Sequence, residues 1–174
     1  NPNSKLITSL PAPVICAVNG VAAGAGASIA LACDMVLAAE SARFIPSFSK
    51  IGLVPDAGSS WVLPRRIGMA RAMGLALTAT ALTAAEAVAC GLIWKSHADA
   101  ALLPAAEELT ATLASGPTTA FAATKMLMQH AASTDFDTHL ALEASTQKSC
   151  AESDDYSEGV EAFLQKRAAK FTGS

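Results

Sequence analysis

The residues whose types and spacing suit chemistry begin with three glycines, Gly20, Gly24 and Gly26, which follow an apolar, β-branched run at residues 14–18. The run predicts a buried strand, and the small residues from Gly24 through Cys33 predict a helix. A glycine turn between a strand and a helix leaves backbone N–H groups unpaired at the positive end of the helix dipole. Such donors suit a phosphate, a carboxylate or a developing oxyanion, and small side chains let a ligand approach the backbone. Tight packing of the strand on the helix explains the same glycines equally well.

Two other interpretations of this segment fail. The glycines miss the G-x-G-x-x-G spacing of a dinucleotide-binding turn. Gly20 and Gly24 form a small-xxx-small pair of the kind found in membrane helices. However, Asn19, Ser28 and Asp34 interrupt the apolar run, so the segment does not have the continuous apolar length of a membrane helix. We therefore expect no membrane-spanning segment here.

Asp56 is the acid/base candidate of the chain, because it lies in a loop at residues 54–59 that leads into a predicted helix. An Asp just before a helix commonly caps it, and capping is the simpler role. Alternatively, Phe48, Val54 and Trp61 would desolvate the carboxylate and make it a stronger base. One residue can fill both roles.

A series of short elements must position these residues. The first eleven residues predict the end of a helix and a polar link, and Asp56 would begin a helix that Pro64 kinks or ends. A capping box at Thr83 and Glu86 predicts another helix start. The expected strands are 14–18, 34–39, 43–45 and 92–94. The expected helices are 24–33, a turn at 47–52, 59–63, 69–78, 83–90, 99–115, 117–132, 135–152 and 154–168.

Composition narrows the class of protein. With 174 residues the chain is long enough for one domain with a real core. Its net charge of −3 argues against nucleic-acid binding. The scattered cysteines predict reduced thiols of a cytoplasmic protein, and the isolated histidines predict no metal site. The cysteines are Cys16, Cys33, Cys90 and Cys150, and the histidines are His97, His130 and His139.

Two segments carry a specific resemblance. PVICAVNGVAAGAGASIALACD at 13–34 and SFSKIGLVPDAG at 47–58 together resemble the crotonase superfamily, the enoyl-CoA hydratases and isomerases, over about residues 10–172. The resemblance implies an α/β fold, with the C-terminal portion of a ββα spiral core at 1–97 and an all-helical region at 98–174. It also implies a preceding segment, about a third of a typical family chain, that supplies a second oxyanion donor.

The resemblance further implies site roles. The N–H of Ala25 would be one of two donors to the oxygen of an acyl-CoA thioester. Hydratases of the family activate water with two glutamates, and Ser28 and Phe48 stand at those positions, so ordinary hydration is not expected. Asp56 matches a loop position whose carboxylate carries protons during isomerisation. The implied substrate-binding residues are Ala23, Gly24, Phe48, Val54, Phe163 and Lys166.

The segments GVAAGAGAS, FSKIGLVPDAGSSW and ARAMGLAL (70–77) are most similar to the ring-epoxide isomerases of bacterial phenylacetate breakdown, which act on 1,2-epoxyphenylacetyl-CoA and also shift double bonds in enoyl-CoA. The expectation is an acyl-CoA isomerase with no cofactor beyond the coenzyme A of its substrate. Family habit implies a homotrimer or homohexamer built through the helical region. The alternatives are an enoyl-CoA hydratase and a non-catalytic crotonase-fold protein.

Overall fold

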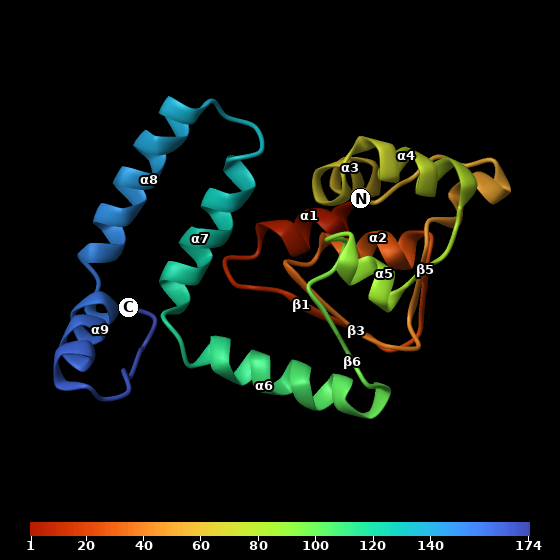
Figure 1. The fold of residues 1–174 in the computed structure, drawn as a ribbon. Coiled ribbons are helices and arrows are strands. Elements are labelled where there is room, and N and C mark those ends of the chain that lie inside the picture. Colours follow the sequence, from red (N-terminus) through yellow and green to blue (C-terminus); the bar gives the residue numbers. More distant parts are fainter. The chain divides into compact units, whose positions relative to one another are not determined.

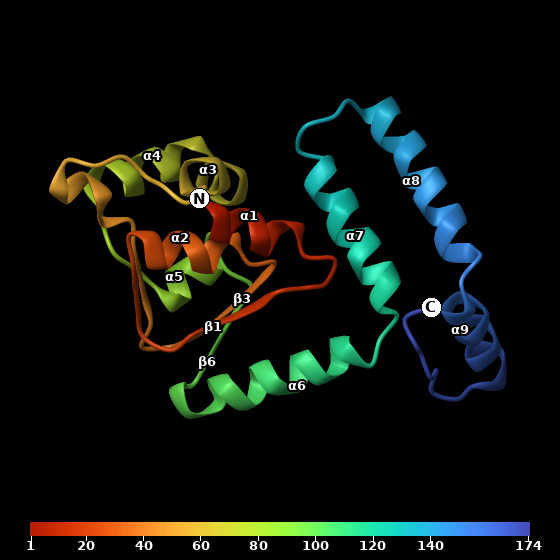
Figure 2. The ribbon, with the colours of Figure 1, turned by 180° about the vertical axis from the view of Figure 1, so that it is seen from behind.

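The computed structural model describes residues 1–174, which form two compact units (Figures 1 and 2). The first unit comprises Asn1–Ser9 and Val14–Glu108, and the second comprises Leu10–Pro13 and Leu109–Ser174. The elements of the first unit are α1 (Pro2–Ser9), β1 (Ile15–Val18), β2 (Val21–Ala23), α2 (Ala25–Ala32), β3 (Met35–Ala39), β4 (Arg43–Ile45), the 3₁₀ helix η1 (Ser47–Ile51), α3 (Ser59–Ile67), α4 (Met69–Thr78), β5 (Leu82–Thr83), α5 (Ala84–Ala89), β6 (Lys95–His97) and the 3₁₀ helix η2 (Asp99–Ala101).

Two small sheets organise the first unit. One has the order β1-β3-β6 with all neighbours parallel, and the other has the order β2-β4-β5, in which β2 and β4 are parallel and β5 is antiparallel. Ala23 lies opposite Ile45 in the β2–β4 pair. Because these strands run in the same direction, the segments that follow them leave the same edge of the sheet. Gly24 and Ser47 are thereby placed next to each other.

The core of the first unit forms around β3. Val36, Leu37 and Ala38 are each at most 1% exposed, as expected for a parallel strand covered on both faces. Phe44 of β4 is also buried. Figures 1 and 2 both show α2 between the strands and the α3–α4 pair, and this helix carries small buried residues that allow close packing.

The second unit consists of helices. They are α7 (Thr118–His130), α8 (Phe136–Ala151) and α9 (Asp154–Gln165), whereas α6 (Leu102–Ala114) runs across the division after Glu108. The chain after α9 is tied back to that helix. The Glu158 carboxylate accepts hydrogen bonds from the Arg167 guanidinium at 2.6 and 2.8 Å and from the Lys170 N–H at 2.7 Å. The bonds from Arg167, and then the one from Lys170, lower the pKa of Glu158 to about 2.

Several sequence predictions are confirmed. The helix at 69–78 matches α4, and the capping box is present, with Thr83 Oγ accepting from the Glu86 N–H and the Glu86 carboxylate accepting from the Thr83 N–H. The mixed α/β class is also confirmed. None of the helices combines the length with the apolar character that a membrane-spanning helix needs.

Other predictions of local structure are wrong. The short strands β2 and β5 were not expected, and the last strand is β6 at Lys95–His97 rather than 92–94. Pro64 does not end its helix, since α3 continues to Ile67. Tertiary bonds hold this continuation: the Arg66 guanidinium donates to the carbonyls of Cys33 and Leu92, both at 3.0 Å. These contacts compensate for the backbone bond that proline removes.

Candidate active site

The turn between β2 and α2 has a conformation that requires glycine. Gly24 has φ 48° and ψ −122°, a combination that L-residues avoid. Its N–H donates to the Ile45 carbonyl at 2.9 Å and so extends the β2–β4 ladder by one bond. A Cβ at this position would lie 3.4 Å from Ser47 Oγ. The same added atom at Gly20 or Gly26 would meet nothing within 4 Å, so packing within this unit does not require those two glycines.

The helix that follows begins at Ala25, one residue after the predicted start at Gly24, and its first amide has no hydrogen-bond partner. The first helical bond at this end runs from the Ser28 N–H to the Gly24 carbonyl at 3.1 Å. Ala23 and Ala25 are both exposed. The Ala25 N–H is therefore an available donor at the positive end of the α2 dipole. Ala25 is not among the residues that line the small cavity beside this turn, and the direction of its N–H toward a substrate stays a prediction.

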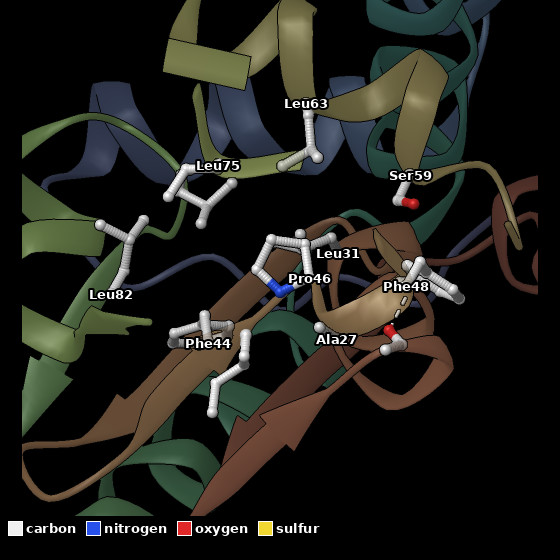
Figure 3. Close-up of a pocket in the computed structure, with 13 residues that line it drawn as sticks. Ala27, Leu31, Phe44, Pro46, Phe48, Ser59, Leu63, Leu75 and Leu82 are labelled. Carbon is white, nitrogen blue, oxygen red and sulfur yellow. Dashed lines mark hydrogen bonds between the residues drawn. The ribbon is translucent and has the colours of Figure 1, made fainter. Parts of the chain in front are cut away.

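The cavity beside this turn is small and apolar. It measures about 20 Å³, roughly the space of one water molecule, and is too small for an acyl group. Figure 3 shows Leu63 and Leu75 facing Leu31 and Pro46 across it. Phe48 and Ser28 also line the cavity and are buried.

The Ser28 and Phe48 side chains supply no acid/base group. Ser28 Oγ donates to the Gly24 carbonyl at 3.2 Å and is 2% exposed. The Phe48 ring approaches Gly24 so closely that a Cβ there would lie 3.9 Å from ring carbon Cζ. The hydroxyl proton of Ser28 is thus engaged with the backbone of the turn, and the ring fills space beside it.

Asp56 lies in the loop between η1 and α3, and two expectations about it are wrong. It is not the cap of α3, because the helix is preceded by Gly58 with φ 92° and has no side-chain cap. It is also not desolvated by Val54 and Trp61, because Asp56 is exposed and these two side chains are 78% and 51% exposed. The Asp56 carboxylate makes no hydrogen bond or ion pair within the chain. It is a free carboxylate on a folded loop.

Phe163 and Lys166 belong to the second compact unit. Phe163 is 82% exposed at the end of α9, and Lys166 follows that helix in a left-handed conformation with φ 54°. Their part in a substrate site stays a prediction. No group of three or more His, Cys, Asp or Glu residues is arranged to hold a metal ion.

Sequence reasoning missed the hydroxyl groups that hold the Asp56 loop. Ser59 Oγ donates to the Asp56 carbonyl at 3.0 Å, and Ser4 Oγ of α1 donates to the Ala57 carbonyl at 2.9 Å. A serine at the first position of a helix is a local signal for the bond from Ser59 to the Asp56 carbonyl. The bond from Ser4 to the Ala57 carbonyl joins residues that are 53 apart in sequence, so no local pattern indicates it.

Comparison with known proteins gives consistent relatives. The family model described as enoyl-CoA hydratase/isomerase matches residues 1–174. The chain is 49% identical over 173 residues to the 1,2-epoxyphenylacetyl-CoA isomerase of Escherichia coli K12, covering 99% of this chain and 66% of that protein. It is 50% identical over 172 residues to the "Probable enoyl-CoA hydratase" of Rhodobacter capsulatus, covering 99% and 67%. The chain thus spans about two thirds of the length of these relatives.

Solved structures give the same result. A crystal structure of an enoyl-CoA hydratase from Polaromonas sp. JS666 matches with a TM-score of 0.94 and 36% identity, over 97% of this chain and 66% of that one. The structure described as an enoyl-CoA hydratase from Bacillus anthracis matches with a TM-score of 0.94 and 33% identity, over 98% and 66%. TM-scores of this size show that the chain has the fold of these solved relatives.

Proposed function

Because the chain belongs to the enoyl-CoA hydratase/isomerase family, we propose that it contributes the proton-transferring half of an acyl-CoA isomerase site. The Ala25 N–H stabilises the negative charge that develops on the thioester oxygen, as a preorganised backbone donor does. The Asp56 carboxylate removes a proton from one carbon of the acyl group and returns a proton to another carbon. The thioester holds the electron pair as an enolate between these steps, so product and substrate have the same atoms.

One observation carries this proposal: Asp56 is an unpartnered carboxylate, while Ser28 and Phe48 offer no carboxylate at the turn. A proton shuttle needs a group that can gain and lose a proton, and this group must lie within reach of the substrate. The Asp56 carboxylate meets the first of these two conditions. Hydration needs in addition a base that activates water, and a hydroxyl bonded to the Gly24 carbonyl is a poor one. The free acid/base group therefore supports isomerisation over hydration. We propose no cofactor apart from the coenzyme A of the substrate.

Two substrate classes fit the proposed site. One is an epoxide-bearing aromatic acyl-CoA, supported by the likeness to a 1,2-epoxyphenylacetyl-CoA isomerase. The other is an enoyl-CoA whose double bond moves along the acyl chain. Both reactions begin with removal of a proton from the carbon next to the thioester, which gives a thioester enolate, so the same donor and the same carboxylate serve both. In the epoxide the carbon–carbon bond common to the epoxide and the ring also opens as the oxepin forms and a ring carbon takes up the proton, so no atom is gained or lost. Ring-epoxide isomerisation is the first choice, and double-bond migration the second.

The competing function is enoyl-CoA hydration, favoured by the likeness to a protein named as a hydratase. To separate the two, the natural protein is incubated with a 3-enoyl-CoA and with a 2-enoyl-CoA, and the products are resolved by chromatography and mass. We expect migration of the double bond in the first without change of mass, and no addition of water to the second. Formation of 3-hydroxyacyl-CoA at a rate matching isomerisation would favour the hydratase. Absence of turnover with both enoyl-CoA substrates and with the ring epoxide would favour a non-catalytic protein.

We also propose that the helical region joins copies of the protein into a homotrimer or homohexamer. Several large apolar side chains of the second unit have no cover within the chain: Phe136, Leu140, Phe163 and Leu164 are 50–82% exposed. Burying such side chains between subunits is favourable. Light scattering of the natural protein is expected to give three or six times the chain mass, and a stable monomer at micromolar concentration would contradict this.

A further inference from the structure

The loop that carries Asp56 is held by backbone bonds, although its carboxylate is free. Its turn contains two successive left-handed residues, Ala57 with φ 49° and Gly58 with φ 92°. The left-handed region is unfavourable for alanine, so surrounding contacts must maintain it. Ala57 is buried, with 7% of the residue exposed, and anchors the loop in the first unit.

Two serine hydroxyls fix the carbonyl groups on either side of this strained position. Ser59 Oγ and the Ser59 N–H both donate to the Asp56 carbonyl, at 3.0 and 2.9 Å. Ser4 Oγ donates to the Ala57 carbonyl at 2.9 Å from α1. Pro55, which precedes Asp56, has its own φ restricted by the proline ring. The peptide planes on either side of Ala57 are therefore held by these bonds, and none of the bonds uses the Asp56 carboxylate.

We propose that Ser59 and Ser4 are positioning residues, which hold the Asp56 loop in the conformation that directs a free carboxylate to the acyl group. This inference rests on the proposed function of Asp56. A carboxylate held through its own oxygens would lose acceptor capacity to its partners. Holding the backbone instead fixes the direction of the side chain and leaves both oxygens open to a proton. Neither serine touches the substrate in this arrangement.

The test uses Ser59→Ala and Ser4→Ala in the natural protein, with steady-state turnover of an isomerase substrate. We expect kcat to fall about tenfold in each, because a misplaced catalytic group loses rate steeply with distance, while KM stays within about twofold. Ser4→Thr keeps a hydroxyl at the same place and is expected to retain activity. Ser60→Ala is the matched control, since Ser60 is exposed and its hydroxyl makes no bond within the chain.

A double-mutant comparison separates positioning from general support of the fold. In an Asp56→Asn background, Ser59→Ala is expected to change the residual kcat by less than about twofold, because the group it positions can no longer transfer a proton. An equal loss of activity in both backgrounds would overturn the inference. Wild-type activity of Ser59→Ala and Ser4→Ala beside an inactive Asp56→Asn would overturn it too, while leaving the proposed function standing. Wild-type turnover by Asp56→Asn would overturn the proposed function itself.

Discussion

Asp56→Asn is expected to lower isomerase turnover about a hundredfold or more, because the amide keeps the shape of the side chain but cannot take up a proton. Affinity for the acyl-CoA substrate should stay within a few fold, since the Ala25 donor is a backbone group that the substitution does not touch. The measurement is kcat under saturating substrate together with an equilibrium dissociation constant for a non-reacting acyl-CoA.

The stability of the Asp56→Asn variant should be close to that of the wild type. Asp56 is exposed, has no side-chain partner and does not cap α3, so the change in unfolding free energy is expected to lie within about 0.5 kcal/mol. Glu40→Gln is the matched control, because it removes another exposed carboxylate of the same unit. Wild-type turnover by Asp56→Asn would assign the acid/base role to another residue.

The sequence predicts best where a local signal sets an element's ends. The helical pattern at 69–78 gives the observed bounds of α4. The capping box of Thr83 and Glu86, three residues apart, locates the start of α5. The glycines of the turn locate the start of α2 to within one residue of Ala25. The local pattern indicated unpaired N–H groups at this helix start, and the family resemblance then assigned the oxyanion role to the Ala25 N–H.

The sequence predicts less well where pairing is long-range. Strand β2 has only three residues and exists because Arg43–Ile45 lies beside it, which no local pattern reveals. The apolar pair Leu92 and Ile93 suggested a strand, but both residues are buried in the core with their N–H groups on the Ala87 carbonyl. The strand forms instead at the polar Lys95–His97, which pairs with β3.

Asp56 shows the same limit at the site. The sequence offered capping and catalysis as roles for one carboxylate, and the structure removes the first, because the left-handed Gly58 starts α3 without a side-chain bond. The desolvating neighbours were inferred from closeness in sequence, yet Val54 and Trp61 leave Asp56 exposed. Burial depends on what covers a loop, and adjacent residues do not specify that.

Gly24→Ala is expected to damage both stability and turnover. Gly24 has φ 48° and ψ −122°, and an alanine held there would be strained by about 1–3 kcal/mol. Contacts with neighbours add little, since the new Cβ would lie 3.4 Å from Ser47 Oγ and 3.9 Å from the Phe48 ring. Relief of the strain requires rotation of the peptide between Gly24 and Ala25, which redirects the Ala25 N–H.

Loss of one preorganised oxyanion donor lowers turnover by roughly a hundredfold to a thousandfold, so we expect Gly24→Ala to lose at least about a hundredfold in kcat. Denaturant unfolding measures the loss of unfolding free energy separately. Turnover is assayed well below the unfolding midpoint, so that both the variant and the wild type are folded in the assay. Gly20→Ala is the matched control, because a Cβ at Gly20 meets nothing within 4 Å and its φ is not in the left-handed range. The control should keep wild-type turnover. If Gly24→Ala is destabilised yet turns over at the wild-type rate when folded, the orientation of the Ala25 N–H has no part in catalysis, and the glycine serves only the geometry of the turn.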